Sequence, residues 1–290
     1  MTSEVKLICA TTVPFTTDGE LDRRGLPELF GAIRDNGIRY VFTPGTTGEF
    51  TGLSDDERVD VIGAAIEVFG PDGVYAHVGA ATARQAATLA ARAHAAGATR
   101  LAAITPYFVK AGPQSVEEYY RTIVAAAPGA EVYVYIFHDR ASTDVTPGEL
   151  AALSRIEGIA GAKVSGLSTA EAIEYVRHAP DGFPVYSGND REFLRFVAAG
   201  GAGGVSGVSN VFPEPFVRAA AALERGEGTV ELQADIDRAV DLTGGGDFAM
   251  LKLGVRELGL PAGPLRIATE PPDPVAAERL RAALAPASIG

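Results

Sequence analysis

One lysine of this sequence lies in a stretch whose composition would make its amine a nucleophile. Lys163 belongs to the segment 158–165, Gly-Ile-Ala-Gly-Ala-Lys-Val-Ser, which is typical of a short buried strand. Alternation along a strand would place Ile159, Gly161, Lys163 and Ser165 on one face. A charged amine is costly to bury, so its pKa falls and the neutral, nucleophilic form becomes populated. An amine that reaches solvent at the strand end is equally favoured by this stretch alone.

A segment rich in glycine and threonine offers a place for an anion. The segment 44–49, Pro-Gly-Thr-Thr-Gly-Glu, directly follows an apolar run at 38–43. Two glycines around Thr46 and Thr47 would form a tight turn with exposed backbone N–H groups and two hydroxyls, which suits a carboxylate. An ordinary glycine-rich turn would have the same composition.

The apolar run 132–137 contains two tyrosines, and an arginine lies shortly after it. Alternation places Tyr133 and Tyr135 opposite the aliphatic residues of this run, so both would point into a barrel. A buried phenol needs a hydrogen-bond partner, and a phenol near a buried lysine could relay protons. Arg140 lies just beyond the run and could bind a substrate carboxylate, although most arginines in loops face solvent.

Two further glycine-rich segments follow later apolar runs, at 187–190 and at 200–210. The second could cradle a phosphate or let a substrate approach the backbone, and the lack of an adjacent basic residue disfavours phosphate. The four histidines are scattered and form no i, i+4 pair with one another, so we expect no metal site.

Apolar runs of strand length alternate with segments of helical period, and these elements would position the residues named above. The first strand is expected at 7–15, and a Ser-Asp-Asp-Glu capping signature opens a helix at 54–69. Eight such units predict a (β/α)8 TIM barrel at 1–225, followed by a C-terminal helical extension at 226–290 packed on it. An open doubly wound sheet is disfavoured because the first turn has no G-x-G-x-x-G fingerprint.

The composition excludes several classes of protein. The chain has 290 residues, of which 47% are hydrophobic and 21% charged, as in an ordinary globular protein. Its formal net charge of −12 argues against a nucleic-acid partner. The single cysteine, Cys9, excludes an intramolecular disulfide. Without a signal-peptide pattern or a run of about 18 apolar residues, we expect a cytoplasmic protein with no membrane contact.

Taken together, the motifs resemble those of the dihydrodipicolinate synthase/N-acetylneuraminate lyase family of class I, Schiff-base-forming aldolases. The resemblance covers residues 7–225, and the tail resembles the extra C-terminal helices of that family. Each motif is weak alone, but their order and spacing are specific, including the 28 residues from Tyr135 to Lys163. The matching motifs are Gly-Thr-Thr-Gly-Glu at 45–49, Thr-Pro-Tyr at 105–107, Tyr135 with Arg140, Gly-Ala-Lys at 161–163, Ser-Gly-Asn-Asp at 187–190 and the segment 204–213.

The resemblance implies a role for each matching residue. Lys163 would form an imine with pyruvate or another 2-oxo acid, Tyr135 would be the general acid/base, and Thr46 would position its hydroxyl. Arg140 would contact the distal part of a second substrate, such as an aldehyde. The other expected substrate-binding residues are Thr47, Gly48, Tyr107, His138, Gly188, Val205 and Ser206. No cofactor is implied, because the lysine supplies the electron sink, and a homo-oligomer (dimer or tetramer) is implied.

The sequence departs from the lysine-pathway synthases of that family. Phe108 takes the place of an aromatic hydroxyl that passes a proton across a subunit contact. Ile136, His138 and Asn189 replace an asparagine, a proline and an aspartate, and His138 is a candidate to contact the second substrate. These changes favour cleavage, condensation or dehydration of another 2-oxo acid over the alternative, 4-hydroxy-tetrahydrodipicolinate synthase. An alternative of another class is a barrel that binds a 2-oxo acid without turnover.

Overall fold

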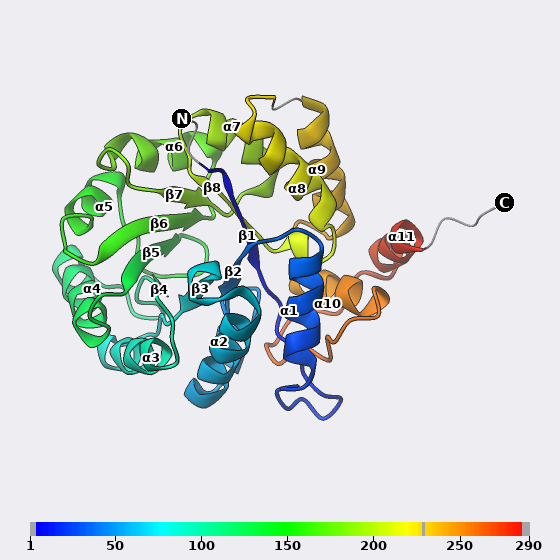
Figure 1. The fold of residues 1–290 in the computed structure, drawn as a ribbon, viewed down its shortest axis with the longest axis horizontal. Coiled ribbons are helices and arrows are strands. Elements are labelled where there is room, and N and C mark those ends of the chain that lie inside the picture. Colours follow the sequence, from blue (N-terminus) through cyan, green and yellow to red (C-terminus); the bar gives the residue numbers. More distant parts are fainter. Residues whose placement is uncertain (1–3, 228–229, 286–290) are drawn as a thin grey trace.

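The computed structural model describes residues 4–227 and 230–285. Its strands are β1 (Lys6–Ala10), β2 (Tyr40–Thr43), β3 (Val74–His77), β4 (Arg100–Ile104), β5 (Glu131–Phe137), β6 (Ile159–Ser165), β7 (Val185–Ser187) and β8 (Gly203–Ser206). These eight strands are parallel and close into a barrel in chain order, with β8 beside β1 (Figure 1). The predicted (β/α)8 barrel is therefore confirmed.

One helix follows each strand and covers the outside of the barrel. The helices are α1 (Gly25–Asp35), α2 (Asp55–Phe69), α3 (Ala83–Ala95), α4 (Pro113–Ala126), α5 (Pro147–Leu153), α6 (Thr169–His178), α7 (Phe193–Ala198) and α8 (Pro213–Glu224). The capping box predicted for α2 is present: the Ser54 hydroxyl accepts from the Glu57 N–H, and the Glu57 carboxylate accepts from the Ser54 N–H. Proline begins α4, α5 and α8, where a helix loses nothing from its missing N–H.

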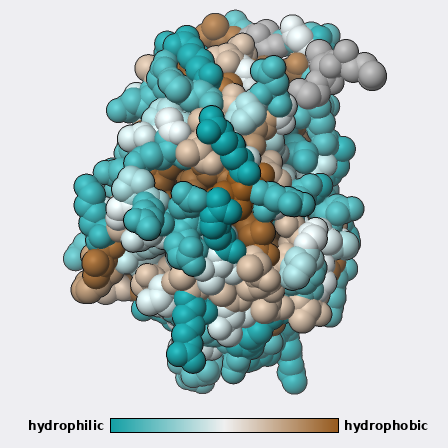
Figure 2. All heavy atoms as spheres, turned by 90° about the vertical axis from the view of Figure 1, so that its left-hand side faces the viewer, coloured by the Kyte–Doolittle hydropathy of each residue, from teal (hydrophilic) through white to brown (hydrophobic). Residues whose placement is uncertain are grey.

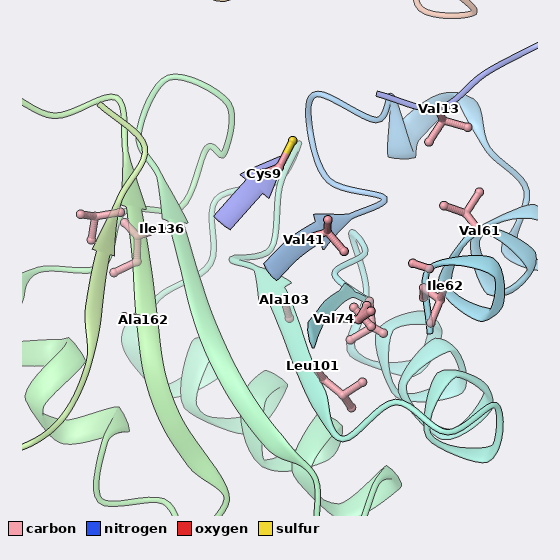
Figure 3. Close-up of a cluster of buried hydrophobic side chains, with 14 of the residues drawn as sticks. Cys9, Val13, Val41, Val61, Ile62, Val74, Leu101, Ala103, Ile136 and Ala162 are labelled. Carbon is pink, nitrogen blue, oxygen red and sulfur yellow. The ribbon is translucent and has the colours of Figure 1, made fainter. Parts of the chain in front are cut away.

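Alternation along the strands separates two hydrophobic layers. The outward face packs against the helices, as Figure 3 shows for Val41 of β2, which lies on the side of Val61 and Ile62 of α2. The inward face fills the barrel with a second cluster in which aromatic side chains predominate, and Tyr133 and Tyr135 belong to it as predicted. The other aromatic residues of this inner cluster that are buried are Phe42, Phe50, Tyr75 and Tyr186.

The first strand is shorter than the sequence predicts. β1 ends at Ala10 rather than at residue 15. Beyond it the chain turns, and Phe15 forms an isolated antiparallel bridge with Leu21. The apolar residues from 11 to 15 are buried in this turn rather than in a strand, which explains why their composition misled the prediction.

A β-bulge changes the predicted faces at the start of β6. Val132 of β5 pairs with Ile159, but the next residue of β5 pairs with Gly161, so Ala160 is an extra residue in the ladder. Ile159 consequently belongs to the outer hydrophobic layer, whereas the prediction placed it on the face of Lys163. Regular pairing resumes at Gly161, and the expected direction of Lys163 is retained.

Three further helices follow the barrel, at the expected places: α9 (Val230–Leu242), α10 (Phe248–Glu257) and α11 (Pro274–Leu284). α9 contacts α8, and α10 contacts the 3-10 turn η4 (Val208–Asn210) that follows β8. α11 packs on α10 and α9. A division of the chain at residue 225 stays a prediction, and 228–229 and 286–290 of the expected extension lie outside the described residues.

The surface on the side of α4 and α5 is largely hydrophilic, with hydrophobic side chains showing in a central band (Figure 2). None of the helices described in 4–227 and 230–285 combines the length and apolar character needed to cross a membrane.

Candidate active site

Lys163 points into the barrel from the carboxyl-terminal part of β6. It pairs with Tyr135 of β5, and only 7% of the lysine is exposed. Its Nζ lies 4.1 Å from the centre of the Tyr135 ring and 4.4 Å from that of the Phe42 ring. The alternative interpretation, an amine that reaches solvent, is therefore wrong.

The surroundings of Lys163 favour the neutral amine. Burial lowers the pKa of Lys163 from 10.5 to about 7, and the negative charge of Asp190 partly opposes this fall. The aromatic rings beside Nζ attract a cation only weakly compared with water, so they do not restore the ordinary value. Near neutral pH a large fraction of the amine is consequently unprotonated and nucleophilic.

Tyr135 and Thr46 form a hydrogen-bonded pair beside the lysine. The phenol oxygen of Tyr135 is 3.1 Å from the Thr46 Oγ1. Burial raises the pKa of Tyr135 to about 12, while hydrogen bonds with Thr46 and Ser165 act in the opposite direction. The phenol is therefore protonated near neutral pH and is placed to give a proton to a group bound at Lys163 and take it back.

The loop that carries Thr46 is folded back on itself between β2 and α2. The Glu49 N–H donates to the Thr46 carbonyl at 3.0 Å, and the Phe50 N–H donates to the Gly45 carbonyl at 3.2 Å. A Cβ at Gly45 would lie 2.7 Å from the Phe42 ring, so only glycine fits there without a shift. This close approach brings the two threonines to the end of the barrel where Lys163 lies.

A cavity of about 200 Å³ opens in front of the lysine. Seven of the residues predicted from the sequence line it: Thr46, Thr47, Tyr135, Arg140, Lys163, Gly188 and Val205. The guanidinium of Arg140 lies over the rings of Phe137 and Phe248, at 6.0 and 5.5 Å from their centres. The cavity thus joins an amine, a phenol, two threonines and a cation.

Four predicted substrate-binding residues lie outside the lining of this cavity. Gly48 is packed so closely that a Cβ there would lie 3.0 Å from the Thr11 carbonyl oxygen. The ring of Tyr107 packs edge-on against Phe50 at 5.7 Å. The two others are turned toward protein groups: Ser206 donates from Oγ to Asp190 at 2.9 Å, and His138 Nε2 is 3.2 Å from the Tyr175 hydroxyl.

Sequence reasoning missed several residues of the cavity wall, above all Asp190, Ser165 and Phe248. Burial raises the pKa of Asp190 to about 7, and its bond from Ser206 and the charge of Lys163 act against this rise. Asp190 was visible as the last residue of the motif at 187–190, and Ser165 as the end of the lysine strand. Nothing local marks Phe248, because it reaches the cavity from α10.

No group of three or more histidine, cysteine, aspartate or glutamate side chains that could hold a metal ion occurs in the described part of the chain. The side chains that line the cavity present an amine, a phenol, hydroxyl groups, the Asp190 carboxyl and the Arg140 guanidinium.

A parallel barrel that presents a partly neutral lysine beside a phenol defines the class of Schiff-base-forming, class I aldolases. The comparison with known families agrees with this class. Residues 4–285 match the Dihydrodipicolinate synthetase family, and the chain belongs to this family of lyase and aldolase enzymes.

Individual relatives lie at moderate sequence distance. The 4-hydroxy-tetrahydrodipicolinate synthase 1 of Streptomyces coelicolor is 32% identical over 270 residues, which cover 89% of this chain and 86% of that protein. YagE, a prophage protein of the dihydrodipicolinic acid synthase family from E. coli K12 solved in complex with pyruvate, has a TM-score of 0.89 at 23% identity and covers 97% of both chains. The sialic acid aldolase of Ruminococcus gnavus has a TM-score of 0.88 at 19% identity, with 98% and 96% covered. These two structures share the fold with this chain.

Proposed function

We propose that this class I aldolase acts on pyruvate or another 2-oxo acid through an imine at Lys163. The observation that carries the proposal is a buried amine with a pKa of about 7, next to a protonated phenol and inside a cavity. Burying an amine so that it is partly neutral costs folding stability, and a barrel that only bound a 2-oxo acid would not need such an amine.

The proposed reaction begins when Nζ of Lys163 attacks the keto carbon of the 2-oxo acid. Tyr135 gives a proton to the carbinolamine oxygen, which leaves as water, and the protonated imine remains. The Tyr135 phenolate then takes a proton from C3, which converts the protonated imine into an enamine. C3 of the enamine attacks the carbonyl carbon of an aldehyde and forms a C–C bond, while Tyr135 gives its proton to the aldehyde oxygen and the product stays bound to Lys163 as a protonated imine. Water releases the product and restores the amine. The reverse sequence cleaves the same bond, and loss of a C3 proton and a neighbouring hydroxyl would dehydrate a sugar acid.

The remaining groups of the cavity have matching proposed tasks. Thr47, with the N–H groups of its loop, binds the carboxylate of the 2-oxo acid, and Thr46 positions the Tyr135 hydroxyl. Arg140, at the mouth and beside Phe248, binds the distal part of the second substrate. Gly188 and Val205 line the path between these two ends.

The 4-hydroxy-tetrahydrodipicolinate synthase reaction is the second candidate, because the curated relative from Streptomyces coelicolor bears that name. Phe108, where the lysine-pathway synthases have a hydroxyl, cannot pass a proton, which favours another second substrate. A coupled assay with pyruvate and aspartate semialdehyde separates the two: turnover would assign the synthase reaction, and its absence alongside imine formation would support another aldehyde.

We also propose that the chain assembles with copies of itself and that it is located in the cytoplasm. Phe108 is 89% exposed and Val109 is 70% exposed, and such neighbouring apolar side chains fit a contact between copies of the chain in a dimer or tetramer. A cytoplasmic location accords with substrates that are small, water-soluble acids.

Borohydride trapping tests the proposed function. Incubation with pyruvate and borohydride should add one reduced pyruvate to the protein, and Lys163→Ala should abolish this adduct. Lys6→Ala is the matched control, because Lys6 also lies on a barrel strand, with its Nζ 3.4 Å from the Tyr75 hydroxyl. An adduct that persisted in Lys163→Ala, or binding of pyruvate without any adduct, would contradict the proposal.

A further inference from the structure

A buried carboxylate directly follows the threonines of the cavity. Glu49 has φ of 55°, in the left-handed region that residues other than glycine rarely adopt. Its side chain is fully buried. Glycine would suit this backbone conformation better, so the carboxylate must make contacts that offset both the backbone strain and its own loss of water.

Those contacts come from the C-terminal part of the chain. Oε2 of Glu49 accepts from the N–H groups of Arg266 and Ile267, at 2.7 and 3.1 Å. Nζ of Lys252, on α10, is 3.0 Å from Oε1. The same ammonium donates to the Pro264 carbonyl at 2.8 Å. One carboxylate thus joins the threonine loop to α10 and to the segment that follows it.

A second ion pair secures the far end of the same loop. The guanidinium of Arg266 contacts both carboxylate oxygens of Glu57 at 2.8 Å and donates to the Gly52 carbonyl at 3.1 Å. These hydrogen bonds lower the pKa of Glu57 to about 2, although burial acts against this fall. The segment around Arg266 is consequently fixed to α2 as well as to Glu49.

α10 also forms part of the cavity wall. Phe248 lines the cavity four residues before Lys252. Leu251 of the same helix lies beside Gly207, which Thr47 also approaches. A Cβ on Gly207 would lie 3.2 Å from the Thr47 Oγ1 and 3.3 Å from the Leu251 Cδ1. The helix that holds Glu49 therefore packs at the same place where Thr47 meets the end of β8.

We propose that Glu49 and Lys252 are positioning residues, whose ion pair holds the Thr46-Thr47 loop in the conformation that binds the carboxylate of the substrate. This inference rests on the proposed function of the cavity and extends it to residues that touch no substrate. The C-terminal helices thereby become part of the binding site rather than a covering of the barrel.

A role in folding stability and a role in positioning predict different behaviour of this pair. A buried ion pair can usually be replaced by apolar residues of similar volume without loss of stability, whereas loss of one partner leaves an uncompensated charge. A role in stability therefore predicts that a neutral double replacement behaves normally. A role in positioning predicts that substrate binding stays impaired, because the ammonium link from α10 to the loop is absent.

The test compares Lys252→Met, Glu49→Gln and the double variant Glu49→Gln/Lys252→Met with the wild-type protein. Two quantities are measured: the pyruvate concentration that gives half-maximal borohydride trapping, and the free energy of unfolding in urea. Each variant should raise the half-saturating concentration by about tenfold, as expected when a binding group is displaced by a fraction of an ångström. Trapping at saturating pyruvate should remain, since Lys163 and Tyr135 are unchanged.

The double variant keeps the test decisive if a single variant fails to fold. Its unfolding free energy should recover toward the wild-type value while its half-saturating concentration stays raised. The matched control is Glu257→Gln, which should leave trapping unchanged. Glu257 lies on α10, as Lys252 does, and the substitution breaks its partly exposed pair with Arg281 of α11, at 3.1 Å. A half-saturating concentration equal to that of the wild type in the double variant would overturn the positioning role of the pair and leave the proposed function of the cavity intact. Absence of any adduct on the wild-type protein would overturn the proposed function, and this inference with it.

Discussion

Replacement of Lys163 by methionine should make the protein more stable while it abolishes imine formation. The lysine is 93% removed from solvent, with aromatic rings at 4.1 and 4.4 Å from its Nζ, and methionine has a similar length without the charge. Burial of Lys163 thus opposes folding, because the side chain must either be desolvated as an ammonium or lose its proton. A methionine in the same position would bury its side chain without that penalty.

The expected magnitude follows from the fall in the pKa of Lys163, from 10.5 to about 7. Because the pKa of Lys163 is lower in the folded chain than in the unfolded chain, burial of the amine costs folding free energy. This cost is complete below about pH 7 and disappears as the pH rises toward 10.5. At pH 7 the penalty is about 4 kcal/mol, and at pH 9 about 2 kcal/mol. These values are upper limits for the gain in unfolding free energy of Lys163→Met, since Asp190 loses the partial positive charge of the lysine beside it.

Urea unfolding of the wild-type and Lys163→Met proteins at pH 7 and pH 9, at one protein concentration, measures this difference. The variant should be the more stable protein at both values, with the larger margin at pH 7. Lys252→Met is the matched control, since its ammonium is paired with Glu49 at 3.0 Å and its loss should destabilise the chain. If Lys163→Met were no more stable than the wild type at pH 7, or if its margin grew toward pH 9, burial of the Lys163 amine would not be what costs the protein stability.

Three further predictions concern the site and its support. Tyr135→Phe should lower kcat by roughly 10²- to 10⁴-fold, because the phenol proton is lost, while the borohydride adduct still forms slowly. Asp190→Asn should move the pH midpoint of adduct formation to lower pH, because the carboxylate charge no longer favours the ammonium of Lys163; a midpoint that rose would contradict this. Ser54→Ala should cost about 1 kcal/mol of stability in urea, because α2 loses its capping box, with pyruvate trapping unchanged.

Local patterns along the chain were enough to predict the class of fold and the direction of the main catalytic side chains. Apolar runs with a period of two and helical segments with a period of 3.6 residues can be recognised locally, and eight of each leave a closed parallel barrel as the natural arrangement. The same alternation predicted that Tyr133 and Tyr135 face inward, and the capping signature predicted where α2 begins. Whether Lys163 is buried was not decidable from its own stretch, because a strand end is compatible with either environment.

The distant residues that complete the site, in contrast, could be identified only in the folded chain. Glu49 and Arg266 are 217 residues apart along the chain, and no local pattern states that the segment after α10 lies on the threonine loop. Phe248 lines the cavity because α10 packs beside it. Ile159 lies on the other face from the one predicted because β6 has a bulge at its start. Such features depend on how whole elements dock. The lowered pKa of Lys163 likewise depends on the side chains that surround its amine, such as Phe42 and Asp190, and these come from other parts of the chain.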